Sequence, residues 1–270
     1  MDNTKPRRHL AIAGTGRAGT SFLVRYLTDL GLDTTLSRRG DTAFWDEEAN
    51  AGLEEDLAAG DASGLPYVVK SPWLFESIEL VLSRSDIVLD AVVVPVRDLV
   101  EAATSRAVLE RQAVHQAAPW MVEANGSWET WGTTAGGLLY SLNPLDEGRL
   151  LAVGFHHLLE RLTAAEVPVV LLAFSKFARD PKYLYRQLRP WLPSSVTELL
   201  AIEVHQKLAD PAKVRIGDEI GTTKTFSATI CAYPEREEVD HIAQVTSLRQ
   251  HADKLRRALS RSIGNFVYGP

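Results

Sequence analysis

A glycine-rich segment near the amino terminus has the composition of an anion-binding loop. It consists of Gly14, Thr15, Gly16, Arg17, Ala18, Gly19, Thr20 and Ser21. Glycines let the backbone turn tightly and direct consecutive N–H groups at an anion, and the amino terminus of a helix adds about half a positive charge. A nucleoside triphosphatase would have a lysine where Thr20 stands, whereas this segment carries its cation, Arg17, inside the loop. The segment therefore predicts a site for a small anion that needs no metal ion.

An arginine and a serine further along the chain form a second candidate binding group. Arg97 follows the apolar run 90–96, and Ser105 lies about two helical turns beyond it. Residues eight apart lie on the same broad side of a helix, so both side chains could bind one phosphate, with charge-assisted bonds of about 1.5–3 kcal/mol each. The alternative is a surface arginine that pairs with Asp98 or Glu101. Beside the glycine-rich loop, we favour phosphate binding.

These two groups need a scaffold that places both of them at the ends of strands. Apolar runs of strand length alternate with segments of helical periodicity along the chain. The expected strands are 9–13, 67–69, 90–96 and 167–174, and the expected helices are 20–30, 76–83, 99–115, 149–166, 181–191 and 245–263. This alternation predicts an α/β fold with a parallel sheet covered by helices on both faces. The tryptophan- and glycine-rich region 113–144 has no clear period and is interpreted as a lid or substrate-facing segment.

The composition limits the classes of function. The 270 residues contain 29 Lys and Arg against 35 Asp and Glu, a net charge of −6, which argues against a general nucleic-acid binder. The single cysteine, Cys231, excludes an intramolecular disulfide and a cysteine-based zinc site, and it favours a reducing cytoplasm. No apolar run approaches the ~18 residues of a membrane-spanning helix. We expect a soluble cytoplasmic protein that binds neither nucleic acid nor membrane.

The two candidate binding groups together resemble those of sulfotransferases that use 3′-phosphoadenosine-5′-phosphosulfate (PAPS). In that family a loop of the form Gly-x-x-Arg/Lys-x-Gly-Thr-Ser/Thr binds the 5′-phosphosulfate, and an Arg and a Ser eight residues apart bind the 3′-phosphate. The stretch 69–72, with Lys70, is similar to a strand-end segment whose lysine approaches the sulfuryl group, and 174–181 is similar to a later strand and helix start. The resemblance covers about residues 9–192. The binding residues that it implies are Gly14, Gly16, Arg17, Ala18, Gly19, Thr20, Ser21, Arg97 and Ser105.

The resemblance implies a single three-layer α/β/α domain of the P-loop NTPase type over residues 1–270. It also implies a sulfuryl-transfer reaction. The sulfuryl group of PAPS would move to a hydroxyl or amine without a metal ion, and Arg17 and Lys70 would stabilise the developing charge. Asp41 is the candidate general base, because 41–46 resembles the segment of heparan-type sulfotransferases in which a glutamate precedes an aromatic-aromatic-Asp triplet. His115 is the alternative base. For the rest of the acidic stretch 46–56, a solvent-exposed helix is predicted.

Two other functions fit the same scaffold. One is a magnesium-dependent small-molecule kinase or nucleotide hydrolase, against which the missing loop lysine argues. The other is a nucleotide-binding protein without catalytic activity. For the sulfotransferase, the expected partners are PAPS, its product adenosine 3′,5′-bisphosphate and a small-molecule or glycan acceptor, and homo-oligomerisation is compatible with the sequence.

Overall fold

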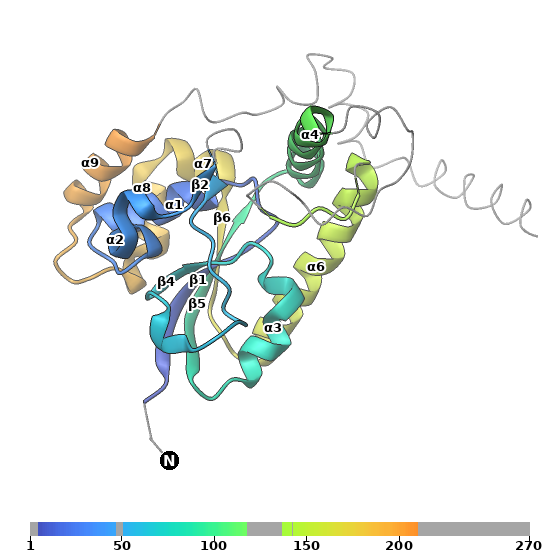
Figure 1. Cartoon of the computed structure of the whole chain (residues 1–270). Coiled ribbons are helices and arrows are strands. Elements are labelled where there is room, and N and C mark those ends of the chain that lie inside the picture. The colour runs from blue at the N-terminus through green and yellow to red at the C-terminus, as the bar shows by residue number, and fades with distance from the viewer. Residues whose placement is uncertain (1–4, 47–50, 118–136, 142, 210–270) are drawn as a thin grey trace, which may run out of the picture. The chain divides into compact units, whose positions relative to one another are not determined.

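A computed structural model describes residues 5–46, 51–117, 137–141 and 143–209, with the backbone alone described over 111–117 (Figure 1). The chain divides into two compact units, residues 1–220 and 221–270, and all described residues belong to the first. The expectation of one domain over 1–270 stays a prediction, because the second unit lies outside the described residues. The predicted helix 245–263 and much of the predicted lid 113–144 also lie outside the described residues.

A parallel sheet forms the centre of the described unit. Its four strands lie in the order β4-β1-β5-β6. The bounds are β1 (Arg7–Ile12), β4 (Val68–Lys70), β5 (Ile87–Val96) and β6 (Val169–Ala173). Ile12 pairs with both Lys70 and Val93, so the carboxyl ends of β1 and β4 meet at one edge of the sheet, and β5 continues past them. The four predicted strands are confirmed, although β5 begins earlier than expected and therefore contains Asp90 in its interior rather than at its start.

Helices cover both faces of this sheet (Figure 1). One face packs against α1 (Thr20–Asp29), α7 (Phe174–Arg179), α8 (Pro181–Leu188) and α9 (Glu198–Leu208). The other face packs against α3 (Leu74–Ser83), α4 (Leu99–Ala117) and α6 (Pro144–Ala164). Successive strand residues point to opposite faces: Leu10 and Ile12 are buried on the α1 side, and Ala11 and Ala13 on the α6 side. The predicted α/β fold with helices on both faces is confirmed.

Local sequence signals set most of the helix ends. Asn143 caps α6 and Pro144 occupies its first turn, so this helix starts before the predicted 149. Asp180 caps α8 in the same way. Two further ends differ from the prediction: β6 stops at Ala173 because α7 starts directly after it, and α8 ends at Leu188 before a 3₁₀ turn that contains Pro190. The helices α7 and α9 were not predicted.

The prediction of an exposed acidic helix over 46–56 is wrong. After α2 (Thr35–Arg39) and a 3₁₀ turn (Gly40–Thr42), the chain forms a short antiparallel pair, β2 (Trp45–Asp46) with β3 (Ala51–Gly52). Residues 47–50 between them lie outside the described part. The apolar side chains of Ala51, Leu53 and Leu57 are buried, and their burial draws this acidic segment onto the sheet. Among the described helices, none is long and apolar enough to cross a membrane.

Candidate functional site

The glycine-rich loop joins the carboxyl end of β1 to the first turn of α1. Four of its residues have positive φ angles: Gly14 at 126°, Gly16 at 71°, Arg17 at 50° and Gly19 at 78°. Such repeated left-handed conformations direct backbone N–H groups into a concavity that suits an anion. Gly19 is the amino-terminal cap of α1 and has no side chain to accept hydrogen bonds from the first turn. The helix terminus is therefore available for an anion rather than closed by its own cap.

The packing of the loop requires glycine at position 19. A Cβ atom there would lie 2.9 Å from ring atoms of both Phe174 and Phe177 on α7. Real Cβ atoms do not approach other atoms so closely, and the φ angle of Gly19 also disfavours other residues. The neighbouring helix thus fixes the position of the loop.

The structure brings Arg17, Arg97 and Ser105 into one cluster. Arg17 Nε donates a hydrogen bond to Ser105 Oγ at 3.3 Å, and Arg97 Nη1 donates to the Arg17 carbonyl oxygen at 2.9 Å. Arg97 also lies 5.3 Å from the ring centroid of Phe174 and pairs with Glu101 at 3.3 Å, the partner named in the alternative prediction. The two candidate groups, 80 residues or more apart in sequence, therefore meet at the loop.

Lys70 lies at the carboxyl end of β4 with its side chain completely buried. Its ammonium group donates three hydrogen bonds: to Ser21 Oγ at 2.8 Å, to the Gly52 carbonyl oxygen at 2.7 Å and to Glu54 Oε1 at 2.7 Å. Burial lowers the pKa of Lys70 from its ordinary value, the Glu54 carboxylate opposes this, and the nearby charge of Arg17 adds to it. The structure thus places a cation of β4 against the first turn of α1, although the loop itself has no lysine.

The two candidate bases have different positions. Asp41 lies in the exposed 3₁₀ turn, and within the described part of the chain no hydrogen bond or ion pair joins it to the other candidate residues. His115 belongs to α4, but its side chain lies outside the described set. The choice between these two bases stays a prediction.

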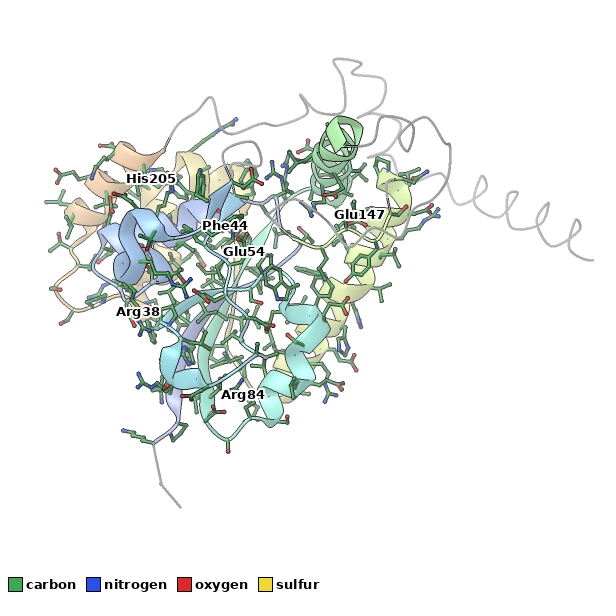
Figure 2. All side chains as sticks on the ribbon, viewed as in Figure 1. Arg38, Phe44, Glu54, Arg84, Glu147 and His205 are labelled. Carbon is green, nitrogen blue, oxygen red and sulfur yellow. The ribbon has the colours of Figure 1, made fainter. Side chains whose placement is uncertain are left out.

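Sequence reasoning missed a set of buried charges on α4 and α6. Arg106 and Glu110 of α4 are ion-paired at 3.7 Å and are almost completely buried. Glu147 of α6, labelled in Figure 2, is fully buried as well. Burial lowers the pKa of Arg106, which Glu110, Glu147 and Glu54 oppose. The spacing of Arg106 and Glu110, four residues apart on a helix, was a usable signal, whereas nothing in the sequence marks Glu54 or Glu147.

Glu147 links α6 to the segment that lies against the loop. Its Oε2 accepts hydrogen bonds from the backbone N–H groups of Tyr140 at 2.7 Å and Ser141 at 3.0 Å. A Cβ atom on Gly137 would lie 3.5 Å from Gly16 Cα, so Gly137 lies next to the loop. The described carboxyl end of the predicted lid therefore does contact the candidate site.

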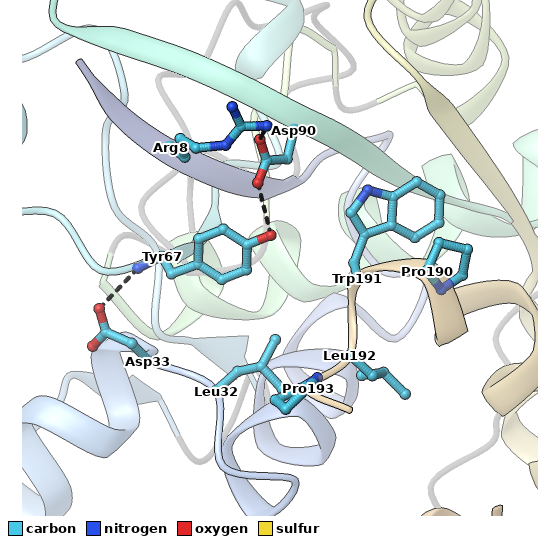
Figure 3. Close-up of a pocket in the computed structure, with 9 residues that line it drawn as sticks. All are labelled: Arg8, Leu32, Asp33, Tyr67, Asp90, Pro190, Trp191, Leu192 and Pro193. Atoms are coloured by element: carbon cyan, nitrogen blue, oxygen red, sulfur yellow. Dashed lines mark hydrogen bonds and ion pairs between the residues drawn. The ribbon is translucent and has the colours of Figure 1, made fainter. Parts of the chain in front are cut away.

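A separate pocket of about 580 Å³ lies near the amino ends of the strands (Figure 3). Tyr67 Oη donates a hydrogen bond to Asp90 at 3.0 Å, Arg8 pairs with the same carboxylate, and Asp33 accepts from the Tyr67 N–H at 3.0 Å. None of the predicted site residues lines this pocket. Within the described ranges, no three His, Cys, Asp or Glu side chains are grouped as a metal site requires, and the expectation of a metal-independent reaction stays a prediction.

No protein-family model matches this chain, and no curated protein matches its sequence. Among solved structures, the crystal structure of sulfotransferase STF9 from Mycobacterium avium is similar, at 15% sequence identity and a TM-score of 0.44. The matched region covers 76% of this chain and 68% of that one.

Proposed function

We propose that this protein is a PAPS-dependent sulfotransferase that acts on a hydroxyl or amine of a small molecule or glycan. The observation that carries the proposal is the convergence of Arg17, Arg97 and Ser105 at a glycine-rich loop that ends in the uncapped start of α1. A helix terminus with two guanidinium groups suits a ligand that carries two separate anionic groups. PAPS is such a ligand, with a 5′-phosphosulfate and a 3′-phosphate.

The proposed assignment divides the cluster between the two ends of the donor. The loop from Gly14 to Ser21 would bind the phosphosulfate, and Arg97 with Ser105 would bind the 3′-phosphate. Arg17 contacts both Arg97 and Ser105, so it lies where the two anionic groups would be closest.

In the proposed reaction, an acceptor oxygen or nitrogen forms a bond to sulfur while the bond from sulfur to the bridging phosphate oxygen breaks. The leaving group is adenosine 3′,5′-bisphosphate, and the acceptor proton passes to a base, Asp41 or His115. Arg17 and Lys70 would stabilise the charge that builds on the bridging and sulfuryl oxygens. Because all three donors of Lys70 are occupied, this lysine has to exchange one acceptor for a sulfuryl oxygen.

Calorimetric titration with adenosine 3′,5′-bisphosphate, adenosine 5′-phosphate and ATP with magnesium tests the proposal. We expect tight binding of adenosine 3′,5′-bisphosphate, and a loss of roughly tenfold to a hundredfold on Arg97→Ala, the equivalent of one charge-assisted hydrogen bond. Adenosine 5′-phosphate should lose little. Arg8→Ala, which removes an exposed arginine from the separate pocket, is the matched control and should bind as the wild type does.

Other outcomes would favour other functions. Equal losses for both nucleotides on Arg97→Ala would refute the 3′-phosphate assignment. Preferential binding and turnover of ATP with magnesium would favour the kinase or hydrolase. Tight bisphosphate binding, without sulfuryl transfer to any member of an acceptor panel, would favour a non-catalytic nucleotide-binding protein.

A further inference from the structure

We propose that Glu54 is the positioning residue of Lys70: its carboxylate holds the ammonium group in its charged form against Ser21, at the start of α1. Three acceptors surround this ammonium, and Glu54 is the one anion among them. The other two are a hydroxyl and a backbone carbonyl. The catalytic consequence of this inference rests on the proposed function, but the pairing itself can be tested without it.

The backbone fixes Glu54 beside Lys70. Glu54 forms an isolated parallel bridge with Lys70, and the N–H of Glu55 donates to the Lys70 carbonyl oxygen at 2.9 Å. The main chain of this acidic segment therefore continues the edge of the sheet next to β4. The carboxylate is held in place before any ligand arrives.

Two unusual residues bring both acceptors of this segment to the ammonium group. Gly52 has a φ angle of 145°, and a Cβ atom there would lie 2.4 Å from the Phe44 carbonyl oxygen, so no larger residue fits. Leu53 is buried with a φ angle of 68°, in the left-handed region that non-glycine residues seldom adopt. Such strain persists where the surroundings hold it, and it often marks functional sites. Here it turns the chain so that the Gly52 carbonyl and the Glu54 side chain reach the same atom.

The charge of Lys70 depends on Glu54 for an electrostatic reason. An ammonium group without solvent loses several kcal/mol of hydration, and buried lysines without a partner release their proton near neutral pH. Arg17 also acts on Lys70 and disfavours its charged form. Glu54 opposes both burial and Arg17, because its negative charge favours the charged form of Lys70. The same carboxylate also favours the charged form of the buried Arg106 on α4. Without Glu54, a neutral amine would replace the cation that stabilises the sulfuryl and bridging oxygens as the bisphosphate departs.

The first test is an NMR titration of Lys70 in protein labelled with ε-¹³C-lysine, with Lys70→Met to assign the signal. Glu54→Gln should lower the titration midpoint by about one pH unit or more. Glu55→Gln is the matched control: it removes the adjacent carboxylate, which pairs with Arg39 and accepts from Thr35, and it should leave the midpoint unchanged. An unchanged midpoint in Glu54→Gln, or the same shift in both variants, would overturn the inference.

A second variant keeps the test decisive if Glu54→Gln fails to fold. The double variant Lys70→Met with Glu54→Gln removes the buried cation together with its partner. It should therefore melt at a higher temperature than Glu54→Gln alone, because a buried lysine without its partner either keeps an uncompensated charge or gives up its proton, and both lower stability. A double variant as unstable as the single one contradicts the pairing.

Activity and binding separate the failure of this inference from the failure of the proposed function. With PAPS and an acceptor, Glu54→Gln should move the basic limb of the kcat profile to lower pH, while the affinity for adenosine 3′,5′-bisphosphate changes little. A shifted Lys70 titration without bisphosphate binding by the wild type would refute the proposed function alone. Bisphosphate binding with an unshifted Lys70 titration would refute the role of Glu54 alone.

Discussion

Glu147 should hold the 137–141 segment against the glycine-rich loop. Replacing this residue measures how much its hydrogen bonds to the segment contribute to the free energy of unfolding. Its carboxylate is fully buried, and Oε2 accepts the backbone N–H groups of Tyr140 and Ser141. Glu147→Ala removes the acceptor of both. Ser141 is buried and Tyr140 is half-buried, and a buried N–H group without a partner costs about 1–3 kcal/mol, so we expect Glu147→Ala to lower the free energy of unfolding by roughly 2–6 kcal/mol.

Glu147→Gln is the informative comparison because the amide oxygen occupies nearly the same place. Neutral hydrogen bonds are about half as strong as charge-assisted ones, but the glutamine also removes the cost of a buried charge. We expect a loss of about 1–2 kcal/mol at most, well below that of Glu147→Ala. The difference between the two variants reports the hydrogen bonds to the segment.

The pH dependence of this comparison has a definite sign. Burial raises the pKa of Glu147, an effect that the two backbone N–H groups and Arg106 oppose only in part. The native protein therefore keeps a proton that the unfolded chain loses above about pH 4.3, and the wild type loses stability as pH rises above that value. Glutamine has no such proton, so the stability of Glu147→Gln relative to the wild type should improve as pH rises.

Urea denaturation from pH 4 to pH 8 measures these free energies, and hydrogen exchange at the Tyr140 and Ser141 amides locates the change. Protection of these two amides should fall in Glu147→Ala and persist in Glu147→Gln. The reasoning would be refuted if the alanine variant were as stable as the glutamine variant, or if the two amides kept their protection in both.

Two further predictions concern stability. Burial lowers the pKa of His9, so the native form stays neutral at pH values below about 6.5, where the unfolded chain takes up a proton. The free energy of unfolding should therefore fall by up to about 1.4 kcal/mol per pH unit below that value. In urea titrations at pH 5 and 7, His9→Gln should show a smaller difference between the two pH values than the wild type does. Gly19→Ala should cost about 1–3 kcal/mol by the same assay and weaken bisphosphate binding, because its methyl group would meet Phe174 and Phe177. Gly60→Ala, with a φ angle of 62° and no atom within 4 Å, isolates the backbone part of this cost; equal losses for the two alanine variants would exclude the packing argument.

Much of the fold was predictable because its signals are local. A strand of the buried parallel sheet is a short apolar run, an amphipathic helix repeats every 3.6 residues, and caps such as Asp180 are read within a few residues. The loop that follows β1 was predictable for the same reason, since its glycines and Arg17 are contiguous. The conformation of residues 46–57 was not, because charged residues outnumber apolar ones there while three buried apolar side chains, Ala51, Leu53 and Leu57, decide the outcome.

The sequence alone therefore determined the alternation of strands and helices, the position of the glycine-rich loop and the candidate pair of Arg97 and Ser105. Only the tertiary structure decided which charges lie together. Lys70 meets Ser21 across 49 residues and Glu54 across 16, and no local pattern encodes either contact. A charged residue normally stays in water because burial removes its hydration, and it can be buried only where a partner compensates. That compensation depends on parts of the chain that are brought together by packing, so the sequence predicted a solvated acidic helix where the fold contains a buried ion pair.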